Sequence, residues 1–104
     1  LYQNEKGELP VISLAPALEE RLLQSIVRTD QGAVLAVDPN DAQRLATRIA
    51  KVLETAVAQP VLLCTPALRP HFWRLFARVL PHVAVLSHNE VPPHVRVSVL
   101  SVLD

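Results

Sequence analysis

The sequence is poor in glycine and cysteine, and both shortages limit its chemistry. Only Gly7 and Gly32 are present among 104 residues. A phosphate-cradling loop needs clustered glycines so that the backbone can approach the phosphate, and we therefore predict no nucleotide cofactor. The single cysteine, Cys64, has no partner for an internal disulfide. Because it lies in the apolar run PVLLCTP (60–66), we expect a buried, reduced thiol.

Net charge and long apolar runs are lacking as well. Ten Lys and Arg balance ten Asp and Glu, so no overall field favours nucleic acid or an anionic membrane surface as a partner. No run approaches the roughly 20 apolar residues of a membrane-spanning helix, and no signal-peptide pattern opens the chain. We expect this piece to be soluble and not to span the membrane. The first residue is Leu rather than Met, which suggests a fragment of a longer protein.

The chain does contain an aliphatic pattern in which strands alternate with helices. Residues 1–9 are polar and indicate a linker or tail from an upstream region, and residues 10–104 indicate a single α/β subdomain. The predicted strands are residues 11–14, 33–37, 60–65, 83–87 and 95–103. The predicted helices are residues 15–28, 38–58 and 66–80. This alternation favours a compact, mostly parallel sheet of four to five strands flanked by three main helices.

The helix over 38–58 has the clearest signals, because Asp38 can cap it and Pro39 suits its first position. Its apolar stripe consists of Ala42, Leu45, Ile49, Val52, Leu53 and Ala56. The strand over 60–65 is apolar on both faces, which is typical of a central position in a covered sheet. In the helix over 66–80, the residues expected to face inward are Leu68, Phe72, Leu75, Phe76 and Val79.

Two stretches with reactive side chains follow neighbouring predicted strands. If those strands are parallel, Cys64 and residues 87–90 (Ser-His-Asn-Glu) meet at the carboxyl edge of the sheet. A Cys64 nucleophile with His88 as base, oriented by Asn89 or Glu90, gives the alternative hypothesis of a small cytosolic α/β enzyme. No cation flanks Cys64 and no CxxC pair is present, whereas reactive thiols need an electropositive setting. We therefore predict no enzyme, and no catalytic or cofactor-binding residue.

All four histidines lie in the C-terminal half of the chain, at His71, His82, His88 and His94. Their spacing matches no metal-ligand motif, so we predict no metal site. Ordinary exposed or hydrogen-bonded histidines are the simplest interpretation, and a pH-responsive docking face is the alternative.

A possible protein-docking face lies on the helix over 66–80. His71, Arg74, Arg78 and His82 fall on roughly one side of this helix, and Trp73 lies near its apolar side. A solvated surface is the simpler interpretation of such a stripe, and a position in the core is the simpler one for Trp73. The functional hypothesis is a face for an acidic partner, because arginine binds carboxylates in bidentate fashion and an exposed tryptophan can anchor an interface.

Four stretches of the chain also resemble a known family when they are taken in order. They are LPVISLAPALEERLLQSI, AVLAVDPNDAQRLATRI, PVLLCTPALRPHFWRLFARVLPHVAVLSHNEVPP and VRV, which together cover nearly all of residues 9–97. The most distinctive pieces are LLCTPALRP (62–70) and VLSHNEVPP (85–93). The set resembles the C-terminal end of the large export-gate protein of bacterial type III secretion systems, a family with flagellar and virulence versions.

The resemblance implies a non-enzymatic subdomain of a much longer protein. That protein would have an N-terminal transmembrane part and a cytoplasmic region that forms a homo-oligomeric ring at the cytoplasmic face of the inner membrane. The implied partners are chaperone–substrate complexes, gatekeeper proteins and the stalk component of the export ATPase. The resemblance implies no catalysis at SHNEVPP, and it assigns no specific binding residues to this chain.

Overall fold

The computed structural model describes residues 7–56, 59–80 and 83–104. Four strands form one sheet: β1 (Leu9–Leu14), β4 (Val61–Cys64), β5 (Ala84–Ser87) and β6 (Val97–Leu103). The helices are α1 (Pro16–Gln24), α2 (Pro39–Thr55) and α3 (Arg69–Phe76), and a short 3-10 helix, η1, covers His88–Glu90. A separate two-stranded hairpin consists of β2 (Ile26–Thr29) and β3 (Gly32–Leu35). The predicted α/β class is confirmed: the expected parallel sheet of four to five strands has four, and the three expected helices flank it.

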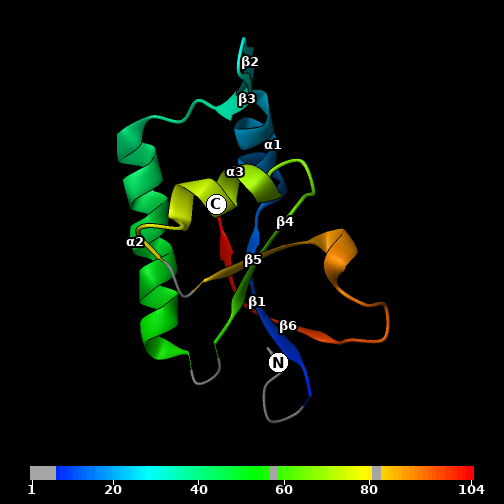
Figure 1. Ribbon diagram of the computed structural model, residues 1–104. Helices are drawn as coiled ribbons and strands as arrows, with labels where there is room; N and C mark the ends of the chain where they lie inside the picture. Colours follow the sequence, from blue (N-terminus) through cyan, green and yellow to red (C-terminus); the bar gives the residue numbers. More distant parts are fainter. Residues whose placement is uncertain (1–6, 57–58, 81–82) are drawn as a thin grey trace.

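The strand order in the sheet is β5-β4-β1-β6, and every neighbouring pair is parallel. The chain leaves β1 towards β4 and β5 on one side and then returns to β6 on the other side (Figure 1). β4 is central and buried along its whole length, as its apolar run predicts. β5 and β6 are the two edge strands.

The two faces of the sheet are covered differently. Strand residues such as Ile12, Leu62 and Val85 pack with Ile49 of α2 and Phe72 of α3 in the main core. The alternate strand residues form a second, smaller cluster, whose buried members are Leu9, Val11, Val61 and Leu63. The partly buried residues packed on that cluster include Val91 and Val95 from the segment between η1 and β6. Three helices therefore cover one face, and a loop covers part of the other.

The predicted helix over residues 15–28 is wrong for residues 25–28. α1 ends at Gln24, and the Ser25 backbone N–H donates to the Leu22 carbonyl in a tightened last turn. The β-branched Ile26 and Val27 then pair antiparallel with β3. Gly32 closes the hairpin with φ 115°, a conformation that L side chains rarely adopt. Residues 33–35 of the predicted strand 33–37 consequently belong to this hairpin and not to the main sheet, and residues 36–37 are outside any strand.

α2 confirms its capping prediction. The Asp38 side chain accepts a hydrogen bond from the Asn40 backbone N–H at 2.8 Å, and Pro39 occupies the first helical position. Leu45, Ala46 and Ile49 form the buried part of its apolar stripe. The last two residues of the predicted helix, 57–58, lie outside the described residues.

α3 is shorter than the predicted helix over 66–80. It runs from Arg69 to Phe76, with Pro70 in its first turn, where a missing N–H costs nothing. Phe72 and Phe76 are buried as predicted, and their ring centroids lie 5.6 Å apart. Val79 is a wrong prediction, because it lies in the turn after the helix with 55% of its surface exposed.

β1 begins at Leu9, two residues before the predicted strand, while most of the predicted 1–9 tail lies outside the described residues. None of the helices in the described ranges combines the length and apolar character that crossing a membrane requires.

Candidate functional site

The two distinctive sequence pieces meet at the carboxyl edge of the sheet. β4 and β5 are parallel and in register, with Cys64 opposite Ser87. The segment that leads into α3 and the segment that forms η1 therefore leave the sheet side by side, as the sequence predicts. α1 approaches the same edge and contributes Glu19, which sequence reasoning did not assign to this region.

Ser87 and Glu90 explain why the SHNE stretch folds as a short helix. The Ser87 side chain accepts from the backbone of Glu90, and the Glu90 carboxylate accepts from the Ser87 backbone N–H at 2.9 Å. This reciprocal pair is a capping box, which satisfies two backbone donors at a helix start. The SHNE stretch has the residue types of a catalytic cluster, but here it forms η1 and caps its N-terminus.

Glu90 also joins η1 to the start of α3. The Arg69 Nε lies 2.5 Å from the Glu90 Oε1 and forms an ion pair with it, although its N–H is not aligned for a hydrogen bond. The Ser87 backbone N–H is the largest cause that lowers the pKa of Glu90 below its ordinary value of 4.5, and the Ser87 hydroxyl and the Arg69 charge lower it further. Desolvation opposes these causes. Glu90 is therefore held as a carboxylate.

Glu19 of α1 makes the second cross-link at this edge. Its Oε2 accepts from the Thr65 backbone N–H at 2.9 Å, and the same oxygen lies 3.9 Å from the His88 Nε2. The Glu19 side chain is 17% exposed, so it supplies an acceptor to a partly buried donor. These contacts thus connect α1, the β4–α3 turn and η1. We call the five residues that make them the carboxyl-edge clasp: Glu19, Thr65, Arg69, His88 and Glu90.

Cys64 lies at the carboxyl edge of the sheet, as the enzyme hypothesis requires, but its thiol is not accessible or activated. The residue is fully buried, and its thiol donates to the Leu86 carbonyl at 3.7 Å. Desolvation is the largest cause that raises the pKa of the Cys64 thiol from 9.0 to about 12, and the nearby Glu19 carboxylate raises it further. A thiol in this setting stays protonated and is a poor nucleophile. His88 faces Glu19 rather than serving as a base for the thiol.

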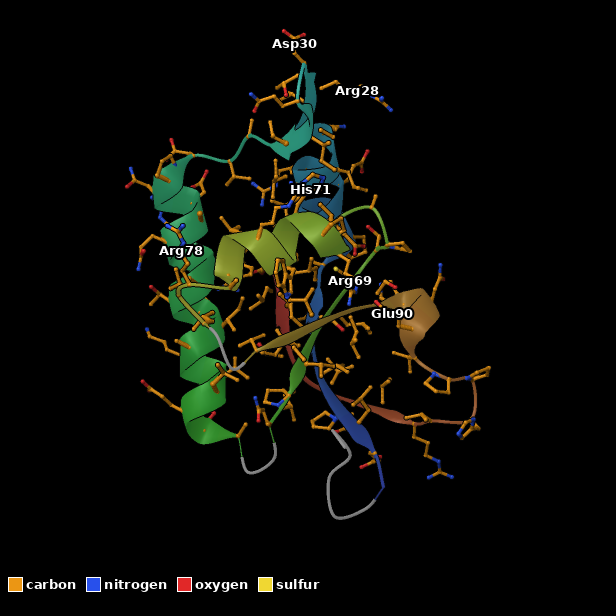
Figure 2. The ribbon with its side chains drawn as sticks, in the orientation of Figure 1. Arg28, Asp30, Arg69, His71, Arg78 and Glu90 are labelled. Carbon is orange, nitrogen blue, oxygen red and sulfur yellow. The ribbon has the colours of Figure 1, made fainter. Side chains whose placement is uncertain are left out.

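The predicted docking residues are divided between α3 and the turn after it. His71 is half-buried on α3, whereas Trp73 and Arg74 on the same helix are exposed, Trp73 to 60%. Arg78 is exposed in the turn beyond Phe76, so His71 and Arg78 lie towards opposite ends of α3 (Figure 2). His82 lies outside the described residues.

An apolar recess adjoins this region and was not predicted from the sequence. It has a volume of about 310 Å³ between the first half of α2 and the end of α3. Its lining residues are Val37, Pro39, Ala42, Gln43, Ala46, Leu75, Phe76 and Val79. Leu75 and Val79 directly follow Arg74 and Arg78 in the chain, so exposed cations and an apolar recess occur together at this end of α3.

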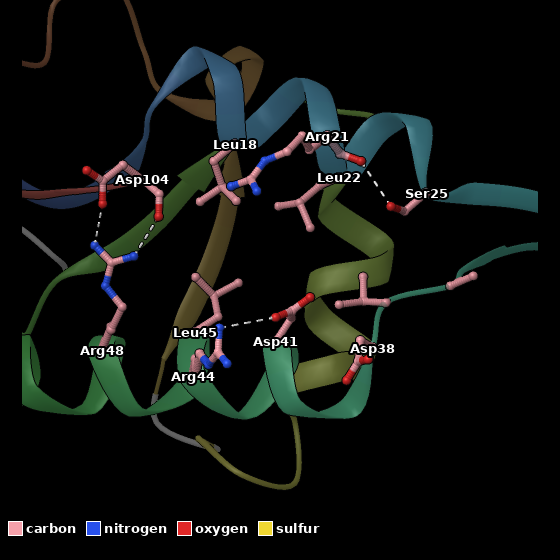
Figure 3. A pocket seen from close by; sticks show the side chains of 12 residues that line it. Leu18, Arg21, Leu22, Ser25, Asp38, Asp41, Arg44, Leu45, Arg48 and Asp104 are labelled. Atoms are coloured by element: carbon pink, nitrogen blue, oxygen red, sulfur yellow. Dashed lines mark hydrogen bonds and ion pairs between the residues drawn. The ribbon is translucent and has the colours of Figure 1, made fainter.

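A larger open groove, of about 520 Å³, lies between α1 and α2 (Figure 3). Leu18, Leu22 and Leu45 supply apolar lining. Its charged lining residues are Arg21, Arg44, Arg48, Asp38, Asp41 and Asp104. Two of these arginines are paired within the groove, because Arg48 contacts Asp104 at 2.9 Å and Arg44 contacts Asp41 at 3.6 Å. The groove therefore has balanced charge and does not select ligands of one sign.

The histidines within the described part of the chain lie on separate elements: His71 on α3, His88 in η1 and His94 in the loop before β6. Over residues 7–56, 59–80 and 83–104, no group of three or more His, Cys, Asp and Glu side chains is arranged to hold a metal ion.

Comparison with curated proteins finds relatives that are flagellar biosynthesis proteins. The flagellar biosynthesis protein FlhA of Borreliella burgdorferi is 28% identical over 106 residues, a match that covers 99% of this chain and 15% of that protein. FlhA of Yersinia enterocolitica is 40% identical over 88 residues, covering 82% of this chain and 12% of the relative. The chain thus spans about one seventh of the length of the curated relatives it matches.

Solved structures agree with the fold. The nonameric SctV-C of EPEC has a TM-score of 0.85 at 22% identity, with 98% of this chain and 31% of that chain covered. The Chlamydia pneumoniae CdsV protein, in its complex with CdsO, has a TM-score of 0.74 at 27% identity, with 99% of this chain and 31% of that chain covered. The FHIPEP family itself matches residues 1–96, which is nearly the whole chain. The chain therefore belongs to the FHIPEP family.

Proposed function

We propose that this chain is the non-enzymatic C-terminal subdomain of a type III protein secretion export gate, where it acts as a ring scaffold and a protein-docking platform. The observation that carries the proposal is the FHIPEP match over residues 1–96. The relatives named FlhA, and the nonameric SctV-C with the same fold, support a role in an export gate and in a ring. The proposed location is the cytoplasmic face of the bacterial inner membrane.

The geometry supports a structural role for the most distinctive motifs. LLCTPALRP and VLSHNEVPP supply four of the five clasp residues, Thr65, Arg69, His88 and Glu90, whose contacts join secondary-structure elements to each other. The buried, protonated Cys64 disfavours the alternative of a thiol enzyme. The motifs hold the docking surfaces in place and perform no reaction.

The proposed docking face consists of His71, Trp73, Arg74, Arg78 and His82. The proposed partners are chaperone–substrate complexes, gatekeeper proteins and the stalk protein of the export ATPase, and the CdsV–CdsO complex supports a stalk-type partner. Exposed arginines offer bidentate contacts to carboxylates, and the recess beside Leu75 and Val79 accepts an apolar side chain. This combination suits an amphipathic acidic helix.

Binding measurements on matched charge reversals test the docking role. The Arg74→Glu/Arg78→Glu variant should bind the purified stalk or chaperone partner at least about tenfold more weakly, because two carboxylate contacts are replaced by repulsion. The Arg28→Glu/Arg96→Glu variant changes net charge equally at exposed positions outside α3 and the turn after it, and it should bind as the parent does. Equal weakening in both variants would show a net-charge effect and reject this face.

An export assay tests the wider proposal independently. Deleting the gene for the full-length protein should abolish secretion of type III substrates into the medium, and the parent gene should restore it. Normal secretion in the deletion strain would overturn the proposed function, whatever the binding measurements show.

A further inference from the structure

β6 is an unprotected edge strand. It is the longest strand of the sheet, and its sequence VSVLSVL contains no charge and no proline. Its side chains Val97, Val99, Leu100 and Val102 are each 43 to 53% exposed. Soluble proteins normally blunt such edges with charges, prolines or a covering segment, since an exposed apolar edge pairs readily with other chains. β6 has neither of the first two protections.

The register with β1 shows which face these valines occupy. Val97 pairs with Leu9, and Val99 pairs with Val11, so they share a face with the smaller apolar cluster. After a bulge at Leu100, Val102 pairs with Ser13 and returns to that same face. The valines therefore extend the smaller cluster beyond the part that the loop before β6 covers. Parallel sheets are normally covered on both faces, and within residues 7–56, 59–80 and 83–104 nothing covers this face of β6.

The chain that enters β1 is close to this uncovered surface. The Leu9 backbone N–H donates to the Arg96 carbonyl at 2.8 Å, so β1 begins beside the start of β6 (Figure 1). Any polypeptide that precedes this subdomain joins it at that end of the sheet. The matched chains of SctV-C and CdsV are about three times longer, because this chain covers 31% of each. The resemblance to the C-terminal end of the export-gate protein puts that extra length before residue 1, where it is ample to cover β6.

A second copy of the chain explains the surface less well. Two β6 strands that pair with each other form a two-fold contact, in which both subunits use the same patch. An odd-numbered ring such as the nonameric SctV-C does not repeat a two-fold contact around its whole circumference.

We propose that the polypeptide preceding residue 1 in the longer export-gate protein packs apolar side chains onto Val97, Val99 and Val102. The inference rests on the proposed function, which makes this chain part of a longer protein. It identifies β6 as the surface through which the subdomain is fixed to the rest of the gate. The surface is distinct from the docking face on α3.

Cysteine labelling in the full-length protein tests the proposal. Cys64 is buried, so a Val99→Cys variant carries one accessible thiol among the described residues of this subdomain, and Val34→Cys in the hairpin is the matched control. Background labelling of other cysteines is subtracted with the parent protein. In the full-length protein, Val99→Cys should react with a maleimide at least about tenfold more slowly than Val34→Cys, because packing protects it. Equal rates would overturn the proposal.

Dilution separates the proposed occupant from a second copy. If the preceding segment of the same chain covers Val99→Cys, its slow labelling persists when the assembly is diluted to monomers. If a second copy covers it, the slow labelling disappears on dilution, and that result would reject our assignment. The secretion assay on the gene deletion tests the proposed function separately from the inference about β6. If secretion requires the protein but Val99→Cys reacts as fast as Val34→Cys, the inference about β6 fails and the proposed function stands.

Discussion

Two regions of the sheet differ in how completely this chain supplies their partners. At the carboxyl ends of β4 and β5, the carboxyl-edge clasp supplies polar partners from α1, α3 and η1. Beside β6, apolar side chains from Val97 to Val102 stand half exposed, with no charged residue in the strand. The first region finds its partners among the described residues, whereas the second leaves apolar side chains half exposed. This contrast is the basis of the proposal that the subdomain attaches to the rest of the longer protein through β6.

Cys64 lies beneath the clasp and gives the largest expected effect. Its pKa is about 12 against an ordinary 9.0, which lowers the thiolate fraction at neutral pH on the order of a thousandfold. Modification by a thiol reagent should therefore be slower by at least that factor in the folded chain than in the same chain unfolded in urea. The unfolded chain is its own control, because it contains a single cysteine. Comparable rates would restore the enzyme hypothesis.

Alanine substitutions on the two faces of the sheet test the contrast in packing. Phe72→Ala removes a fully buried ring from the helix-covered core and should lower the free energy of unfolding by about 3–5 kcal/mol. Val99→Ala, at a side chain 52% exposed, should cost less than about 1 kcal/mol in the 104-residue chain. Urea titration of both variants measures the difference. Similar losses would mean that β6 is already packed within this chain.

Local signals in the sequence were sufficient for the helix-covered core. Asp38 and Pro39 mark the start of α2, and the continuous apolar run of 61–64 marks the central strand, because these signals depend on nearest neighbours and on burial of both faces. The end of α1 was missed because Ile26 and Val27 fit a helical stripe as well as a strand. Only pairing with β3, which the Gly32 turn permits, decides between the two structures.

The clasp was half predictable. Parallel strands bring Cys64 and Ser87 to one edge, and the alternation of strands with helices is enough to expect that. Glu19 was not identified, because its partner Thr65 is 46 residues away and one glutamate in a first helical turn is ordinarily a dipole effect. The recess at the end of α3 was missed for a related reason. It forms because the helix ends at Phe76, before Val79, and the sequence does not show where the helix ends.

Glu19 and its neighbour Glu20 measure what the clasp contributes. Glu19→Ala removes the acceptor of the Thr65 backbone N–H and leaves a partly buried donor unpaired, which should cost about 1–3 kcal/mol of unfolding free energy. Glu20→Ala, at an exposed position on the same helix, should stay within about 0.5 kcal/mol. A Glu19→Gln variant keeps an oxygen acceptor and should recover part of the loss. Equal effects at 19 and 20 would show that the clasp adds no stability.

The pH dependence of stability gives the smallest effect and isolates Glu90. Its pKa is lowered in the folded chain, chiefly by the Ser87 backbone N–H, so the folded state favours the carboxylate relative to the unfolded state. The resulting stability is fully present above the ordinary pKa of 4.5 and is lost as the pH falls through the folded pKa. The difference in unfolding free energy between the parent and Glu90→Gln should stay constant from neutral pH to that value and narrow below it. A difference that does not change at acid pH would show that Glu90 stabilises η1 without its charge, and the contrast between a charged edge and an apolar edge would then be wrong for this residue.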